Sequence, residues 1–212
     1  MARALWHRVQ ALSFWVRICT AAPLLLAYWL TGARALIRAD AERWMSISAE
    51  QQWKWLPHRR AKTVQLLYLL AYPRPFRNVF YYRTEHGGIA GRVTAKALRV
   101  LYRGEVALEL HAASIGPGLY IAHGFATIVV WNAVIGANCW LHQNVTIGWG
   151  SGDGAPRIGD DVTIYTGAVV IGDIAVGDGV IVGANAVVAR DVPAGVVARG
   201  VPATYHPRRP TS

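Results

Sequence analysis

One histidine in the second half of the chain has the character of a catalytic base. His123 lies in the segment IAHGFATIVV, beside Gly124 and among apolar residues. A histidine near neutral pKa can take a proton from an alcohol that attacks an acyl group. The other interpretation is a surface histidine that makes a hydrogen bond and has no part in catalysis. Zinc chemistry is disfavoured, since Cys19 and Cys139 stand apart with no CxxC spacing and no histidine cluster near them.

A repeat of six residues organises the part of the chain that holds His123. β-branched aliphatic residues recur at every sixth position from Ile158 to Val188, and a second apolar or small residue stands four positions after each. The first series is Ile158, Ile164, Val170, Val176, Val182 and Val188, and the second is Val162, Ala168, Ile174, Val180, Ala186 and Val192. A period of six fits neither an amphipathic helix nor a strand meander. It predicts short strands joined by tight corners, three to a coil, with glycine supplying positive φ at the corners.

Two irregular steps interrupt this repeat, and both lie near the histidine. The step from Ile121 to Val129 is eight residues and the step from Ile147 to Ile158 is eleven, whereas the neighbouring steps are six. The longer step predicts that WGSGDGAPR, residues 149–157, leaves the coil as a loop. Insertions in solenoids gather on a binding face.

The first half of the chain differs in composition and charge. Residues 1–108 hold 17 Lys and Arg against 5 Asp and Glu, residues 109–212 hold 5 against 7, and the net charge is +10. Six of the nine tryptophans lie within the first 55 residues. Apolar residues three and four apart indicate helices, with breaks at Pro23, Thr31–Gly32, Pro57, Pro73–Pro75 and Gly87–Gly88, and a last helix over 92–102.

The basic, Trp-rich segment predicts contact with an acidic partner, whether anionic lipid, nucleic acid or a negatively charged cosubstrate. Its composition suits helices at a membrane interface, and buried helix contacts explain it nearly as well. The uncharged run from Ile18 to Ala33 is shorter than the ~20 residues that span a bilayer. A secretory leader is disfavoured because Arg17 divides the apolar stretch. Nucleic-acid binding is disfavoured because no recognition motif accompanies the arginines. Two isolated cysteines favour the cytoplasm, and the basic segment adds the inner face of the membrane as a second location.

The repeat, together with LELHAASIGPGLYIAHGFATIVV, NVTIG and the ending ARGVPA, resembles the hexapeptide-repeat acyltransferases, in particular the serine O-acetyltransferase-like branch. The resemblance covers about residues 73–205. It implies a left-handed parallel β-helix of about five coils, acetyl-CoA as cosubstrate, no metal, and a homotrimer with active sites between neighbouring coils. We therefore expect a helical region over 1–104, a β-helix acetyltransferase domain over 105–205 and a flexible tail over 206–212.

The resemblance also assigns roles to single residues. His123 matches the catalytic base, and Glu109 falls where the family has an aspartate that orients it. Acetyl-CoA is expected along the later coils, and the acceptor near the base and the long loop. The residues so implied for acetyl-CoA are Gly167, Ala168, Gly183, Ala184, Arg199 and Gly200. The residues that we expect near the acceptor are His142, whose position is apolar in the family, Gln143 and Asp153.

Two positions that hold serine in the family differ here. Ala122 replaces an aspartate that helps hold the amino group, and Ala155 replaces a histidine that grips the carboxylate. We therefore expect O-acetylation of a sugar, polysaccharide or other small-molecule hydroxyl, with serine acetylation as the first alternative. A non-catalytic β-helix scaffold carried to membranes by its N-terminal segment is the second alternative.

Overall fold

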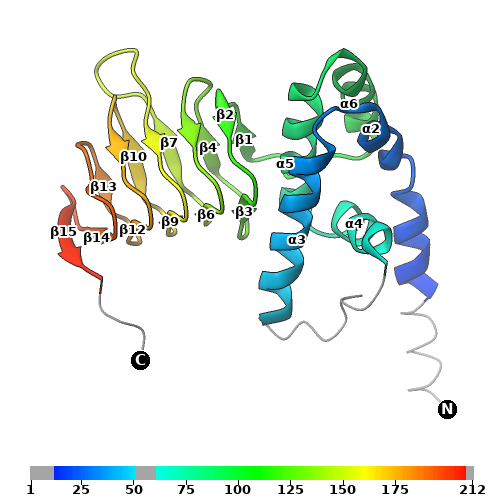
Figure 1. The fold of residues 1–212 in the computed structure, drawn as a ribbon, viewed down its shortest axis with the longest axis horizontal. Helices are drawn as coiled ribbons and strands as arrows, with labels where there is room; N and C mark the ends of the chain where they lie inside the picture. Colours follow the sequence, from blue (N-terminus) through cyan, green and yellow to red (C-terminus); the bar gives the residue numbers. More distant parts are fainter. Residues whose placement is uncertain (1–11, 51–60, 209–212) are drawn as a thin grey trace. The chain divides into compact units, whose positions relative to one another are not determined.

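The computed structural model describes residues 12–50 and 61–208, and Figure 1 shows its helices and strands. Contacts between Cα atoms divide the chain into two compact units at Gly104 and Glu105. The first unit is helical and the second is built from short strands. Each unit has its own apolar core.

Proline and glycine set the helix boundaries in the first unit. Pro23 directly precedes the second helix, Pro73 precedes the helix that begins at Arg74, and Gly87–Gly88 separate the last two helices. The described helices are Leu12–Thr20, α2 (Leu24–Leu30), α3 (Arg34–Glu50), α4 (Lys62–Ala71), α5 (Arg74–His86) and α6 (Ile89–Leu101). The helix expected over 92–102 begins three residues earlier, directly after the glycine pair, and the break expected at Pro57 lies outside the described residues.

The helical unit packs large apolar side chains around a buried ion pair. Phe76, Phe80 and Tyr81 of α5 are at most 1% exposed. Arg83 Nε donates to Asp40 Oδ2 at 2.8 Å, with both side chains at most 2% exposed. Such a pair is costly to break, because either charge alone would stay buried without compensation. It therefore fixes α5 against α3.

Among the described residues, no single helix has both the length and the apolar character needed to cross a bilayer. Within residues 12–50 and 61–208, one bent pair, Leu12–Thr20 with α2, reaches that length and apolar character when its two helices are taken together, at an angle of 42°.

The second unit is a parallel β-helix with three sheets. Strands one coil apart pair in parallel, so that Ile147 lies beside Val170 and Leu141 beside Ile164. The sheets are β1-β4-β7-β10-β13, β2-β5-β8-β11 and β3-β6-β9-β12-β14-β15. The strands are β1 (Leu108–Leu110), β2 (Ser114–Ile115), β3 (Tyr120–Ile121), β4 (Thr127–Val129), β5 (Val134–Ile135), β6 (Trp140–Leu141), β7 (Thr146–Gly148), β8 (Arg157–Ile158), β9 (Thr163–Ile164), β10 (Val169–Ile171), β11 (Ala175–Val176), β12 (Ile181–Val182), β13 (Val187–Val188), β14 (Val196–Arg199) and β15 (Thr204–Pro207).

The two series of repeat positions form the core of this β-helix, as the spacing predicts. All twelve residues from Ile158 to Val192 in those series are at most 6% exposed. The corners are less uniform than expected, because asparagine and aspartate as well as glycine adopt positive φ there. Asn138, Asn144, Asp161 and Asn185 have φ of 55–57°, a conformation that short Asx side chains tolerate.

The C-terminal boundary differs from the expected flexible tail over 206–212. β15 runs from Thr204 to Pro207 and pairs antiparallel with β14, so that His206 lies beside Val197. Backbone pairing with the last coil orders this segment and covers the end of one sheet. Residues 209–212 lie outside the described part of the chain.

Candidate functional site

His123 sits at a sharp corner of the β-helix. β3 ends at Ile121 and β4 begins at Thr127, and the chain between them turns through positive φ at His123 (56°) and Ala126 (54°). The Phe125 N–H donates to the His123 carbonyl across this turn. The His123 side chain is exposed rather than packed in the interior. An imidazole that accepts a proton from an incoming alcohol needs this accessibility.

A buried threonine ties this corner to the next coil. The Thr127 side chain is fully buried, and its Oγ1 donates to the His142 carbonyl at 3.0 Å and accepts from the Val145 N–H at 3.3 Å. The Asn144 N–H also donates to the Phe125 carbonyl at 3.0 Å. These bonds fix the backbone of the two neighbouring corners relative to each other.

His142, predicted as an acceptor contact, lies on the next coil, near enough to His123 for the charge of one ring to affect the other. Its ring stacks on Trp140 with centroids 5.6 Å apart and an interplanar angle of 2°, and on Tyr165 with centroids 4.7 Å apart. Burial, and to a lesser degree the positive charge that His123 can carry, lower the pKa of His142 below its ordinary value. This environment favours a neutral His142, which keeps a second positive charge away from His123.

Glu109 does not contact His123 in this structure. On β1, Leu108 is buried and Glu109 is exposed, and the Glu109 Oε2 lies 3.5 Å from His111 Nε2. Both of these side chains are 58% exposed. The orienting role expected for Glu109 therefore stays a prediction, and it requires the carboxylate to move away from His111.

The long insertion leaves the coil after β7, as predicted from the eleven-residue step. Figure 1 shows this loop in yellow beyond β7, and the chain returns to the coil at β8, which begins at Arg157. The Trp149 Nε1 donates to Asn132 Oδ1 at 2.6 Å, and Asn132 Nδ2 donates to the Asp153 carbonyl at 2.7 Å. The Asp153 side chain is left exposed. The loop is thus held on the outer surface of the coil by Asn132.

Two polar atoms next to His142 have no hydrogen-bond partner in the described part of the chain. Trp140 Nε1 is a buried donor and Gln143 Oε1 is a buried acceptor. Buried polar atoms in native proteins are bonded in the great majority of cases, so a ligand or a partner chain is a natural candidate for each. Gln143 was predicted as an acceptor contact, whereas no pattern in the sequence singled out Trp140.

The positions expected for acetyl-CoA divide into two groups. Gly183, Ala184, Arg199 and Gly200 gather at one corner of the last coils, where the Gly183 N–H donates to the Ala198 carbonyl at 2.8 Å and a Cβ on Gly183 would lie 3.4 Å from the Arg199 Cβ. Gly167 lies one coil earlier at φ 73°, close to Asn185.

Ala168 differs from the other positions of this set. Its side chain is 0% exposed because it occupies an inward position of the repeat. Only its backbone is therefore available to a ligand outside the coil. The expected contact with acetyl-CoA is a close approach to the backbone at Ala168, and it stays a prediction.

An open hollow adjoins Arg199 at the last coil. Its volume is about 560 Å³, and it is lined by Val197, Arg199, His206 and Pro207. Arg199 is exposed. The Arg199 guanidinium and the His206 ring can both donate hydrogen bonds to an anion. In residues 12–50 and 61–208, no three His, Cys, Asp or Glu side chains are arranged to hold a metal ion.

Comparison with known proteins places this geometry in a family. The sequence profile described as "Bacterial transferase hexapeptide (six repeats)" matches residues 155–190. The chain is 34% identical to a serine acetyltransferase of Synechococcus elongatus over 140 residues, which are 63% of this chain and 57% of that protein. It is 40% identical to a serine acetyltransferase of Helicobacter pylori J99 over 113 residues, which are 51% of this chain and 66% of that protein.

A solved structure extends the match beyond the coil. The soybean serine acetyltransferase complexed with serine aligns with a TM-score of 0.56 and 30% identity, over 82% of this chain and 70% of that one. The chain belongs to the serine acetyltransferase-like branch of the hexapeptide-repeat family. This family membership confirms the resemblance and the fold predicted from the six-residue period. The chain spans 57–66% of the length of the two curated serine acetyltransferases above, so its own reaction is a separate question.

Proposed function

We propose that this protein transfers an acetyl group from acetyl-CoA to a hydroxyl group, with His123 as the general base. The observation that carries the proposal is an exposed imidazole at a left-handed corner of a hexapeptide coil, beside a second imidazole whose pKa is lowered. The serine acetyltransferases to which the chain is similar support the reaction class.

The proposed step is a direct transfer. As His123 takes the hydroxyl proton, the acceptor oxygen attacks the thioester carbon and a tetrahedral oxyanion forms. The C–S bond then breaks, and the imidazolium returns its proton to the sulfur, which leaves as the free thiol of coenzyme A. A positioned base supplies about 10² to 10⁴ in rate, and the remainder comes from orientation and from donors to the oxyanion.

His142 supports this step through its charge. A neutral His142 adds no repulsion when the imidazolium forms at His123, whereas a protonated His142 would raise the cost of forming it. Stacking between Trp140 and Tyr165 holds the ring in place. We assign His142 as a positioning residue that shapes the field at the base.

We place coenzyme A along the corner that holds Gly183, Ala184 and Gly200. Small residues there let an extended arm approach the backbone, and Arg199 is the exposed cation at that end. Phosphate groups bind arginine through paired N–H donors. The hollow between Arg199 and His206 is the proposed position of the nucleotide end.

The comparisons favour serine over the sugar acceptor that we expected first. The similar proteins carry the name serine acetyltransferase, and one solved relative is complexed with serine. A sugar or other hydroxyl stays as the second candidate because of Ala122 and Ala155, whose side chains are 8% and 6% exposed and carry no charge. Neither methyl group can hold the ammonium or carboxylate of serine.

We propose a homotrimer as the assembly, since the family resemblance puts the active site between neighbouring coils. Exposed aromatic side chains on the coil near the site, among them Phe125 (53%), Trp131 (65%) and Trp149 (43%), are candidates for that contact. Light scattering on the purified chain measures the mass directly. A monomer would contradict the assembly.

The reaction is tested by thiol release from acetyl-CoA in the presence of serine and of a panel of glycosides. His123→Asn and His123→Ala remove the base, and asparagine also tolerates the positive φ of this position. We expect both to lower kcat/KM by about 10² to 10⁴ on the true acceptor. His111→Ala is the matched control, because that imidazole is exposed and directly follows β1, beside Glu109.

The outcome assigns the acceptor as well. Faster release with serine than with any glycoside supports serine acetylation, and the reverse supports the second candidate. Equal release by wild type and both His123 variants with every acceptor would contradict the enzyme proposal and leave a non-catalytic scaffold.

A further inference from the structure

The first two described helices present an uncharged face to solvent. Along this pair the buried positions recur at Ile18, Ala21, Leu24 and Ala27, each at most 3% exposed. The opposite positions, also three or four apart, are all exposed and none is charged. They are Leu12, Trp15, Val16, Cys19, Ala22, Pro23, Leu26, Trp29 and Leu30, and we call them the Leu12–Leu30 face.

This face is unusual for a helix that meets water. Leu12, Leu26 and Trp29 are 67%, 56% and 60% exposed. A surface helix of a globular protein normally carries polar residues on its outer side. α2, with the sequence LLLAYWL, has no charged residue on any side. Large exposed apolar areas of this kind mark contacts with a protein partner or a membrane.

Cations border the Leu12–Leu30 face. The Arg34 guanidinium lies 5.8 Å from the centre of the Trp29 ring, and the Arg17 guanidinium lies 5.7 Å from the Tyr72 ring. Tryptophan and arginine are the residue types that settle at the boundary between acyl chains and headgroups. Arginine at this depth meets lipid phosphates.

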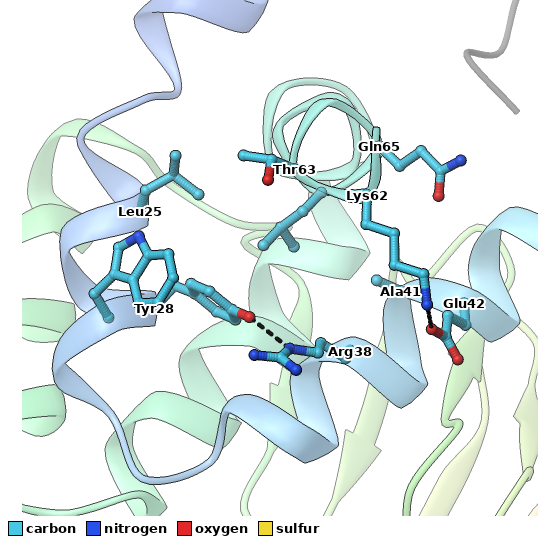
Figure 2. Close-up of a pocket in the computed structure, with 10 residues that line it drawn as sticks. Leu25, Tyr28, Arg38, Ala41, Glu42, Lys62, Thr63 and Gln65 are labelled. Atoms are coloured by element: carbon cyan, nitrogen blue, oxygen red, sulfur yellow. Dashed lines mark hydrogen bonds and ion pairs between the residues drawn. The ribbon is translucent and has the colours of Figure 1, made fainter. Parts of the chain in front are cut away.

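A hollow next to this face adds two more cations. It has a volume of about 260 Å³ and lies between α2, α3 and α4, with Leu25 and Tyr28 on one side (Figure 2). The Arg38 Nε donates to Tyr28 Oη at 2.8 Å, and Lys62 Nζ lies 2.5 Å from Glu42 Oε1. Arg38 is exposed and the Lys62 side chain is 80% exposed, so both remain accessible to a headgroup.

The charge of the helical unit selects the occupant. Residues 1–104, which form this unit, hold 17 Lys and Arg against 4 Asp and Glu. A second copy docked on the same face would bring two strongly positive units together, which is unfavourable. A surface of anionic lipid is attracted instead, and each basic residue near such a surface contributes about 1 kcal/mol. The apolar side chains at the centre of the face match the acyl chains of a bilayer, and the cations at its border match the anionic headgroups.

We propose that the Leu12–Leu30 face docks this protein on a bilayer that contains anionic phospholipids. The helices lie in the interface with Leu26 and Trp29 among the acyl chains, and Arg34 and Arg38 lie at the phosphates. The proposal is independent of the acetyl-transfer reaction.

Vesicle cosedimentation of the full-length protein, without acetyl-CoA, tests the proposal. The vesicles are phosphatidylcholine alone and phosphatidylcholine mixed with phosphatidylglycerol. We expect binding to the mixture that weakens as salt is added. The double variant Leu26→Ser/Trp29→Ser should bind about tenfold or more weakly, and Arg34→Gln about fivefold more weakly.

The matched control is Ile89→Ser/Val93→Ser on α6. These side chains are 80% and 64% exposed and belong to the same unit, but they lie outside the Leu12–Leu30 face. Circular dichroism shows whether each variant keeps its helices. We expect the control to bind as the wild type does.

Four results would overturn the proposal. They are a wild type that binds neither vesicle, a Leu26/Trp29 variant that binds like the wild type, a control that loses binding equally, and a Leu26/Trp29 variant whose mass in light scattering falls. The last result would mean that a second copy covers the face. None of these results bears on acetyl transfer, which is measured in solution.

Discussion

Thr127 offers the sharpest test of how the site is held. Its Oγ1 is the hydrogen-bond partner of two backbone groups on the next coil, the His142 carbonyl and the Val145 N–H. Thr127→Val keeps the shape and the β-branch but leaves both groups without that partner. Val145 is fully buried, so leaving its N–H without a partner costs about 1 to 3 kcal/mol of stability. The His142 carbonyl is part-buried and can form a replacement hydrogen bond with water, so its loss costs less.

The expected total for Thr127→Val is thus about 2 to 4 kcal/mol of unfolding free energy. Thr127→Ser is the matched control, because it keeps the hydroxyl and removes one methyl group, at a cost of about 1 kcal/mol. Urea denaturation followed by circular dichroism compares the two variants with the wild type.

A second measurement links the same bonds to function. If Thr127 fixes the corner that carries His123, the valine variant loses about tenfold or more in acetyl transfer at a temperature where it is still folded. A valine variant as stable as the serine variant would refute the reasoning. A valine variant that loses stability but keeps full activity would also refute it, since other contacts would then hold the corner that carries His123.

Three further predictions concern the coil and its histidines. Ile164→Ala should lower the unfolding free energy by about 2 to 5 kcal/mol, because Ile164 is fully buried in the core of the coil. Ile128→Ala, at a side chain that is 41% exposed, should cost less than about 1 kcal/mol in the same urea titration. Because the pKa of His142 is lowered in the fold, the unfolded chain binds its proton more readily; stability from this group is complete above pH ~6.5 and is lost as pH falls below it. The Tm should therefore fall less between neutral and acidic pH in His142→Phe, which keeps the stacking, than in the wild type. An equal fall of Tm in the two proteins would contradict the lowered pKa of His142. Glu109→Gln should lower kcat/KM less than about tenfold, since the carboxylate lies beside His111 in this structure. A loss of about 10² or more would show instead that Glu109 orients His123 during the reaction.

The sequence predicted the β-helix well because each inward position is specified locally. A corner every six residues brings the next aliphatic side chain to the interior, so that Ile158, Ile164 and their successors could be assigned without knowledge of the fold. The same period marked the loop after Ile147 and the corner at His123, because both break it. His123 could be selected on these grounds as well as on the resemblance.

The partners of His123 could not be read from spacing in the same way. Glu109 was selected because it matches an aspartate of the family, and its orienting role stays a prediction, since its carboxylate lies 3.5 Å from His111 Nε2 in this structure. Thr127 was overlooked, since a threonine after an alanine is an ordinary strand residue in sequence. Its function arises only when the next coil lies beside it.

By itself the sequence determined the six-residue period, hence the stacked coils, the buried ladder and the places where the coil must bulge. Tertiary structure alone decided which side chains meet across coils, such as His142 stacked between Trp140 and Tyr165 beside His123. It also decided which side of the apolar helix α2 faces water. The physical reason is that burial of a repeat position follows from local geometry, whereas a contact between residues about twenty positions apart depends on the register in which one coil settles on the next.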